Sequence, residues 1–368
     1  MNKLKIALVK QEVYQDLYVC PVTEKDPGQI LFSSMGRVGP IALMSDLNAD
    51  FYIVKEESNK ETRIYQKVIP HIAPYLHLLK TETLDKIPGQ EFKSPGSPYP
   101  NGKYAVSCYT IDWGQYDMVI SINISLPTQL ILKYPQTLFA YMIGEANIAT
   151  GKARFGYDAT LNQMARGRIS HKCGAIDFPY TFVAKDTLEK IMQQYLGRPS
   201  ARKGIFMEIN STTERPVTRI PDHFQPLADA GYEIILHQQK IADNLKNIYD
   251  AKYFVKMGGR SIRGNSVAEA VSLGTLAIMN RDEVIHHELI IDECNVKTMD
   301  EMISLINRLE NDPELYRTLQ QKQRQVLHTY FFDAPLQSLI NCLKEKRGLS
   351  KPRTYSRWNR LFDNLYFL

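Results

Sequence analysis

Short apolar runs alternate with amphipathic stretches along the first half of the chain, and this pattern predicts strands separated by helices. Such runs are typical of strands that are buried in a parallel sheet. The apolar runs are Leu4–Val9, Phe51–Val54, Tyr104–Tyr109, Met118–Ile122 and Leu138–Met142. We therefore expect a parallel or mixed sheet flanked by helices in the amino-terminal half.

The second half alternates more regularly between strand-like and helix-like segments. The predicted strands are Gly204–Ile209, Tyr232–Leu236, Tyr253–Met257 and a run from Leu276. The predicted helices are Asp222–Ala230, Ile241–Ala251, a helix starting near Asn265 or Ser266 that either residue caps, Thr298–Asn311 and Pro313–Tyr330. This order is typical of a doubly wound α/β domain.

A domain boundary is predicted at Leu196–Lys203, where a glycine, a proline and small polar residues follow the amphipathic helix Thr187–Tyr195. A chain of 368 residues is long enough for two cores. We expect domains at 1–196 and 204–333, with 334–368 as a carboxyl-terminal helix and tail. The segment 87–103 holds four prolines and three glycines, which predicts a loop. In a two-domain enzyme such a loop often shapes an acceptor site.

Composition narrows the class of protein. The net charge of +5 is small for this length and does not favour nucleic-acid binding. The five cysteines are widely spaced and form no C-x-x-C pair, which favours free thiols in a reducing compartment. We find no pattern of a signal peptide or a membrane span, and we expect a cytoplasmic protein.

The richest chemistry lies in the segment 253–280, which reads as strand, glycine turn, helix and strand. Gly258 and Gly259 follow the apolar strand, where open α/β sheets bind their ligands. The next helix would direct its first amides at a diphosphate, with Arg260 and Arg263 beside it. Glu269 on this helix can accept hydrogen bonds from two ribose hydroxyls.

This segment resembles the donor-sugar half of GT-B glycosyltransferases, whose signature places S/P-V-x-E-A before a glycine and an isoleucine. Here the matching residues are Ser266–Ala270, Gly274, which sits where a C′ glycine ends a helix, and Ile278. The preceding residues 250–254 and the double glycine look most like the exostosin-type and fucosyltransferase-type families. Ser261 stands where many retaining members carry a second glutamate, so the resemblance does not imply retaining chemistry.

The resemblance implies an α/β protein with the GT-B fold, in which two Rossmann-like domains face a central cleft. It implies a glycosyltransferase of the kind used in polysaccharide biosynthesis, with a nucleotide-sugar donor in the second domain and a glycan or lipid-linked saccharide acceptor in the first. The donor-binding residues would be Asn210, Arg215, Arg219, His237, Gly258, Gly259, Arg260, Arg263, Asn265, Ser266 and Glu269. Arg215 and Arg219 also fit helix-start charges, and His237 also fits a structural histidine.

Metal chemistry is not indicated by the sequence. No Asp-x-Asp motif occurs, so helix amides and arginines would neutralise the diphosphate without a metal or a cofactor. His286 and His287 are adjacent, which is not the spacing of a metal pair on one face, and this favours a surface or core role.

By the same resemblance, Glu145 corresponds to a catalytic glutamate that follows an apolar strand, here 138–143. An apolar wall would raise the pKa of that carboxyl and make it a better base. A place near a helix start is the alternative reading, with Asp177 and His171 as further candidates. The basic segment 151–173 is either a solvated face or an anion site.

The tail 344–368 interleaves basic and aromatic residues. It would either contact an anionic membrane surface or pack across the amino-terminal domain. Two further functions stay open from the sequence: a sugar-nucleotide epimerase of the same architecture, which needs two acid/base groups, and a non-catalytic two-domain binding protein for small molecules.

Overall fold

The fold of the protein was analysed in a computed structural model. It describes residues 4–11, 19–23, 26–33, 47–54, 76–79, 110–122, 126, 128–143, 157–162, 175–179, 188–208, 217–238, 241–262 and 264–346. The chain forms two compact units. The first takes Met1–Leu17, Pro40–Pro179 and Pro335–Leu368, and the second takes Tyr18–Gly39 and Tyr180–Ala334. The domain limits predicted above, 1–196, 204–333 and 334–368, remain a prediction.

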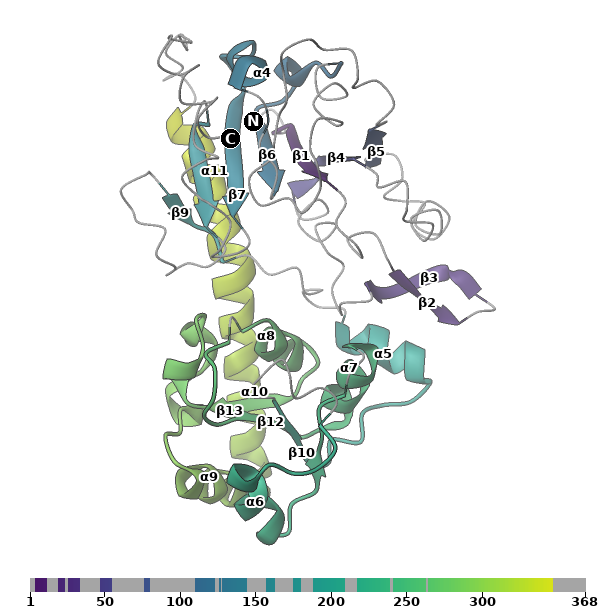
Figure 1. Ribbon diagram of the computed structural model, residues 1–368, viewed down its shortest axis with the longest axis vertical. Coiled ribbons are helices and arrows are strands. Elements are labelled where there is room, and N and C mark those ends of the chain that lie inside the picture. The colour runs from purple at the N-terminus through teal and green to yellow at the C-terminus, as the bar shows by residue number, and fades with distance from the viewer. Residues whose placement is uncertain are drawn as a thin grey trace. The chain divides into compact units, whose positions relative to one another are not determined.

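The first unit is built on a parallel sheet of seven strands in the order β5-β4-β1-β6-β7-β8-β9 (Figure 1). The strands are β1 (Ile6–Gln11), β4 (Asp50–Val54), β5 (Leu76–Leu79), β6 (Met118–Ile122), β7 (Leu138–Ile143), β8 (Ala159–Asn162) and β9 (Ala175–Asp177). Strand order reverses between β1 and β6, as in a Rossmann sheet.

Four of the five strands predicted in this half are confirmed as β1, β4, β6 and β7, with limits that shift by at most two residues. The fifth, 104–109, and the proline-rich loop 87–103 lie outside the described residues. The sequence pattern did not predict β5, β8 and β9, which are short. Few residues leave little hydrophobic periodicity to detect.

One hydrophobic cluster of the first unit lies against one face of this sheet. Inward-facing residues of β1, β6 and β7 pack with Trp113 of a short 3-10 helix, η3 (Trp113–Gln115), and with Leu130 of α4 (Thr128–Leu132). Trp113, Leu130 and Phe139 are fully buried. Burial on this scale supplies the hydrophobic stabilisation that holds the α4 layer on the sheet.

The second unit contains a parallel sheet of four strands in the order β11-β10-β12-β13. The strands are β10 (Ile205–Met207), β11 (Ile234–Ile235), β12 (Tyr253–Lys256) and β13 (Leu276–Met279). All four predicted strands are confirmed. A separate antiparallel pair, β2 (Val19–Thr23) and β3 (Asp26–Ser33), belongs to this unit and was not predicted.

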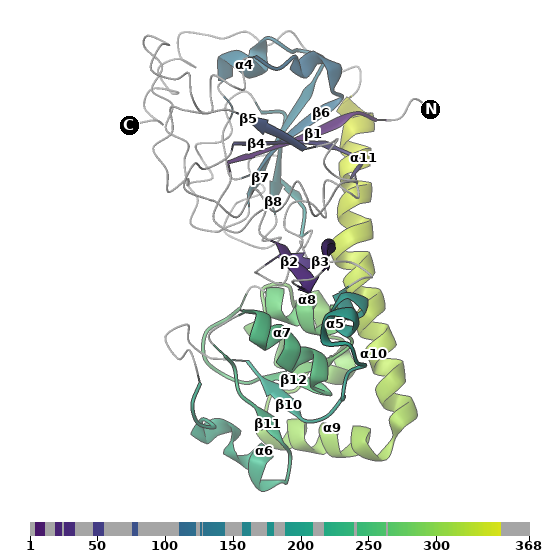
Figure 2. The ribbon, with the colours of Figure 1, turned by 90° about the vertical axis from the view of Figure 1, so that its right-hand side faces the viewer.

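Helices cover both faces of the four-stranded sheet. Figures 1 and 2 show α7 and α8 on one face and α6 and α9 on the other. The helices and 3-10 turns are α5 (Leu188–Leu196), η7 (Asp222–Phe224), α6 (Gln225–Asp229), α7 (Ile241–Asp250), α8 (Asn265–Ser272), η8 (Arg281–Glu283), η9 (His287–Leu289), η10 (Asp292–Cys294), α9 (Met299–Asn311) and α10 (Pro313–His328). The predicted helical segments are therefore confirmed within a few residues.

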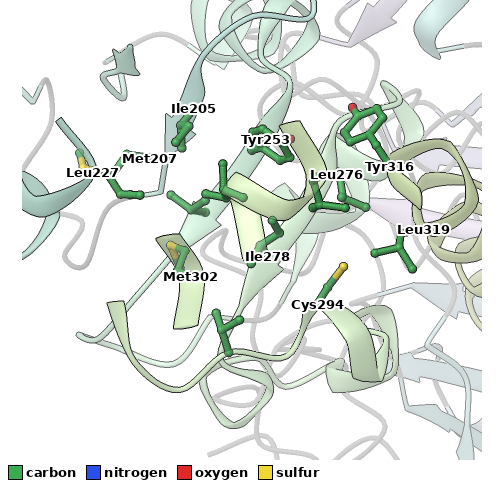
Figure 3. Packing of buried hydrophobic residues seen from close by; sticks show 14 of the residues in the cluster. Ile205, Met207, Leu227, Tyr253, Leu276, Ile278, Cys294, Met302, Tyr316 and Leu319 are labelled. Atoms are coloured by element: carbon green, nitrogen blue, oxygen red, sulfur yellow. The ribbon is translucent and has the colours of Figure 1, made fainter. Parts of the chain in front are cut away.

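A hydrophobic core of the second unit lies on the α6 and α9 side of the sheet (Figure 3). Alternate strand residues point into it, among them Ile205, Tyr253 and Ile278. The apolar face of α9 contributes to this core. Its residues Met302, Ile306 and Leu309 are buried there, and Met299 and Ile303 pack against them.

After α10 the chain forms a π-helical segment, η11 (Thr329–Asp333), and then α11 (Ala334–Lys346). The second unit ends at Ala334, directly after this segment. Across the described ranges, none of the helices combines the length and the apolar character that a membrane span requires.

Candidate functional site

The polar edge of the second unit's sheet lies at the carboxyl ends of β10 and β12. These strands are neighbours, and the chain leaves them in opposite directions, towards β11 and towards β13. Such a switch point leaves a place where ligands bind in open α/β sheets. Glu208 follows β10 directly, and the predicted glycine turn follows β12.

Both glycines of this turn adopt left-handed backbone conformations, with φ angles of 72° at Gly258 and 73° at Gly259. A side chain in that region of φ is strained, so the turn requires glycine. A Cβ atom on Gly258 would have no heavy atom of the described residues within 4 Å. The described residues therefore leave the space beside Gly258 unfilled.

A buried ion pair between Lys256 and Glu283 fixes the turn. The Lys256 ammonium donates hydrogen bonds to the Gly258 carbonyl oxygen at 2.6 Å and to Glu283 Oε2 at 2.7 Å. Glu283 Oε1 accepts the Gly258 N–H at 2.8 Å. The Lys256 side chain is fully buried and that of Glu283 is 17% exposed. The Gly258 N–H therefore donates to a side chain of the protein itself.

The helix that follows, α8, begins at Asn265 as predicted, but the predicted cap is wrong. The N-cap residue is Gly264, with a φ angle of 109°, and Asn265 and Ser266 are the first two helical residues. Among the described residues, no side chain caps the helix. The reason is tertiary: a Cβ on Gly264 would lie 3.2 Å from Val284 Cγ1, so the close approach of this segment selects glycine.

The far end of α8 confirms the prediction made for Gly274. Its φ angle is 82°, its N–H donates to the Val271 carbonyl at 3.0 Å, and the Thr275 N–H donates to the Ala270 carbonyl at 2.9 Å. This is a Schellman arrangement, which satisfies carbonyl oxygens at the helix end. The limits of α8 are therefore fixed by a glycine on each side.

Glu269 lies in the second turn of α8 and is 7% exposed. The neighbouring helix residues Val267, Ala268, Ala270 and Val271 are buried as well. Burying a carboxylate is costly unless it is paired or hydrogen-bonded, and Glu269 does have an interaction partner. Its predicted contact with a ribose stays a prediction.

A second polar cluster lies at the ends of β10 and β11. His237 is buried, and its Nε2 lies 3.8 Å from Glu208 Oε1. Its Nδ1 lies 2.8 Å from the Gln238 carbonyl oxygen. Asn244 of α7 holds both residues, since its amide nitrogen lies 3.2 Å from His237 Nδ1 and 2.8 Å from the Gln238 oxygen.

Glu208 also lies at this site, although the sequence pattern did not predict it as a site residue. Its backbone N–H donates to the Val255 carbonyl at 2.9 Å, so it extends the pairing of β10 with β12 and lies at the switch point. The signal was present in the sequence, because Glu208 is an acidic residue at the end of an apolar run. It was read as part of the strand.

The other predicted residues are only partly covered by the structure. Arg219 and Arg260 are exposed. Asp177 is the last residue of β9. Asn210, Arg215, Arg263, Glu145 and His171 lie outside the described residues, as does most of the basic segment 151–173. Their predicted roles stay predictions.

The adjacent histidines have separate environments. His286 is buried, and its ring meets that of Phe331 edge to face at a centroid distance of 5.0 Å. His287 begins the 3-10 turn η9 and is partly exposed. Within the described part of the chain, no three His, Cys, Asp or Glu side chains gather closely enough to hold a metal ion.

No protein-family model matches this sequence, and no curated protein matches it. Solved structures do. The Anabaena protein Alr3699/HepE in complex with UDP and glucose is 9% identical, covers 93% of this chain and 99% of its own, and gives a TM-score of 0.50. The chain has the GT-B fold. The predicted α/β class is thereby confirmed.

Two other solved structures are similar along nearly the whole chain. Sucrose-phosphate synthase from Thermosynechococcus elongatus is 14% identical over 94% of this chain and 100% of its own, with a TM-score of 0.48. T4 phage β-glucosyltransferase is 12% identical over 94% of this chain and 99% of its own, with a TM-score of 0.43.

Proposed function

We propose that this protein is a glycosyltransferase that moves a sugar from a nucleotide-sugar donor to a glycan or lipid-linked saccharide acceptor. The observation that carries the proposal is the arrangement after β12. Two left-handed glycines lie beside the switch point, together with an α8 amino terminus that no described side chain caps, and the helix carries Glu269 in its second turn. Free helix amides and a positive helix end suit a diphosphate.

Two further facts support this reading. The signature of residues 266–278 resembles that of GT-B donor domains, in particular the exostosin-type and fucosyltransferase-type families. HepE, which shares the fold, was solved with UDP and glucose. The proposal of a metal-independent reaction rests on the sequence, which lacks Asp-x-Asp; one T4 phage β-glucosyltransferase structure contains UDP and Mn²⁺.

In the proposed reaction the bond between the anomeric carbon of the sugar and the diphosphate oxygen breaks, and an acceptor hydroxyl oxygen bonds to that carbon. The electron pair of the broken bond leaves with the nucleoside diphosphate. Amides of Gly259 and of the first turn of α8, together with Arg260 and Arg263, neutralise the departing charge. Glu269 holds the ribose hydroxyls.

If the configuration inverts, the acceptor hydroxyl must lose a proton to a base. We assign this step to Glu145, which follows β7 of the first unit in the sequence. Arg215 and Arg219 would add positive charge on the β10 side, and Asn210 and His237 would contact the ribose or the base.

The proposal is tested by thermal-shift measurements with ADP, GDP, UDP and dTDP. One of them should raise the melting temperature of the parent protein, because a ligand that binds only the folded state stabilises it. The shift should be much smaller for Glu269→Gln, which removes the charge but keeps the shape. Glu314→Ala, at an exposed position of α10, is the matched control and should behave as the parent does. A parent protein that none of the four nucleotides stabilises would overturn the proposal.

Transfer assays then test the base. Glu145→Gln should lose turnover by a factor on the order of 10² or more, while nucleotide affinity stays close to that of the parent. A product that is an epimer of the donor sugar, formed without an acceptor, would instead identify an epimerase.

A further inference from the structure

The fully buried Lys256 is the last residue of β12 and lies under the glycine turn. A buried ammonium is costly unless its charge and its donors are satisfied. Here the two oxygens around it meet that need, one from Glu283 and one from Gly258. A hydrophobic residue of similar volume would satisfy the packing more cheaply. The buried ion pair of Lys256 and Glu283 therefore suggests a role other than stabilising the fold.

The geometry identifies that role. Glu283 and Lys256 together hold both backbone groups of Gly258: the N–H donates to Glu283 Oε1 and the carbonyl accepts from Lys256 Nζ. Side chains therefore hold Gly258 at both its N–H and its carbonyl oxygen, and this fixes the turn with its two consecutive left-handed glycines. Gly258 has open space on its Cβ side among the described residues, so packing there does not hold the turn.

Backbone hydrogen bonds of Glu283 and Ile285 anchor the segment that leads into α8. The Ile262 N–H donates to the Glu283 carbonyl at 2.9 Å, and the Ile285 N–H donates to the Ile262 carbonyl at 2.9 Å. Glu283 therefore holds the turn by its side chain and the approach to α8 by its backbone. A shift of this residue would move the amides of both segments together.

Charge adds a second reason for the pair. A carboxylate hydrogen-bonded to the Gly258 amide would repel a diphosphate at the neighbouring amides. Lys256 lies 2.7 Å from that carboxylate and cancels its charge where solvent screens little. With Lys256 present, the pair carries no net charge.

We propose that Lys256 and Glu283 are positioning residues, which fix the glycine turn and hold its amides ready for a diphosphate. This inference rests on the proposed function, since it names the residues that shape the same site. Neither residue contacts the ligand in this proposal. Their effect passes through Gly258.

The variants are chosen to separate position from stability. Lys256→Met leaves Glu283 without its buried counter-ion and should lower both the melting temperature and diphosphate affinity. In the double variant Lys256→Met/Glu283→Leu no buried charge is left alone, so the melting temperature should recover. Affinity should not recover, because Gly258 has lost both partners. Glu283→Gln keeps one oxygen acceptor for the Gly258 N–H but turns its amide nitrogen towards Lys256, so it should lower the melting temperature while it retains affinity.

The matched control is Lys252→Met. Lys252 precedes the same strand and pairs with Glu310 at 2.9 Å, at the end of β12 away from the turn. It undergoes the same chemical change without touching Gly258. Its nucleotide affinity should equal that of the parent.

Binding is measured by calorimetry with the nucleoside diphosphate that stabilises the parent, and with pyrophosphate. For the double variant we expect a loss on the order of tenfold for both ligands, which corresponds to about one hydrogen bond. Parent-like affinity in the double variant, or affinity that follows the melting temperature through the series, would overturn the inference and leave the proposed function intact.

A ligand-free measurement keeps the two proposals apart. Hydrogen exchange followed by mass spectrometry should show the peptide around Gly258 protected in the parent and in Lys252→Met. In the double variant this peptide should exchange about tenfold faster or more, with the peptides of β10 and β13 unchanged. Equal protection in all variants would contradict the positioning role even if the parent bound no nucleotide.

Discussion

At the scale of single residues, glycines set the geometry of the candidate site. Gly258 and Gly259 form the turn, Gly264 caps α8 and Gly274 ends it, all with positive φ angles. Gly274 also lies in a crowded place. A Cβ there would lie 2.5 Å from Arg202 Nη2 and 2.5 Å from Arg324 Nη2. Arg202 in turn donates from Nη2 to the Leu273 carbonyl at 2.6 Å, so this contact closes the carboxyl end of α8.

Gly274→Ala should therefore lower the free energy of unfolding by more than backbone strain alone. Strain in the left-handed region costs about 1–2 kcal/mol, and displacement of Arg202 adds to it. Gly231→Ala is the matched control, since Gly231 has a φ angle of 89° and no heavy atom within 4 Å of its Cβ position among the described residues. Urea unfolding of both variants measures the difference. Equal losses would show that Arg202 moves aside without cost.

At the scale of elements, helix ends in the second unit are defined by local hydrogen bonds that the sequence encodes. Thr298 and Glu301 form a capping box at α9: Thr298 Oγ1 accepts the Glu301 N–H at 3.2 Å, and Glu301 Oε2 accepts the Thr298 N–H at 3.3 Å. Asp312 caps α10 through the Leu315 N–H at 2.9 Å. The helix α8 differs, because its cap is a glycine chosen by a tertiary contact.

Thr298→Ala should destabilise the second unit by about 1 kcal/mol, the usual cost of losing an N-cap hydroxyl. Thr298 is exposed, so the change removes the hydrogen bond and disturbs little packing. Thr298→Ser keeps the hydroxyl and should remain close to the parent. Chemical unfolding monitored by circular dichroism gives both values, and a loss shared equally by the serine variant would assign the effect to the methyl group.

At the scale of the whole molecule, the chain forms two units with separate cores. The reactivity of Cys294 indicates whether one of these cores is folded. Its side chain is fully buried in the core of the second unit. Burial raises the pKa of the Cys294 thiol to about 12 from its ordinary value of 9.0. The thiolate is the reactive form of cysteine, so the folded protein should protect this residue from alkylation.

Iodoacetamide labelling at pH 8 should therefore modify Cys294 only as the second unit unfolds, and peptide mass spectrometry measures this site by itself. Alkaline pH should also weaken the unit. Between about pH 9 and 12 the unfolded thiol loses its proton while the folded thiol keeps it, so the free energy of unfolding falls as pH rises. Cys294→Ala should remove this contribution. Fast labelling of the native protein would contradict the buried position.

Local pattern determined most of the second unit. The apolar runs predicted β10, β12 and β13, the amphipathic spacing predicted α7, α9 and α10, and Gly274 predicted the end of α8. These features depend on residues within one or two turns, so a single sequence contains the information. The sequence also indicated the glycine pair after β12, because two glycines that follow an apolar run mark the end of a buried strand.

Tertiary structure decided what distant residues do to one another. Three features of the site join segments that lie apart in the sequence. They are the strand order that makes a switch point of β10 and β12, the role of Gly264 as the cap in place of Asn265 or Ser266, and the contact of Glu283 with Gly258. Lys256 looked like one more residue of an apolar strand, and Glu208 like another. Only the folded chain brings Lys256 to its carboxylate and places Glu208 beside His237, since such pairings depend on the packing of strands and not on local periodicity.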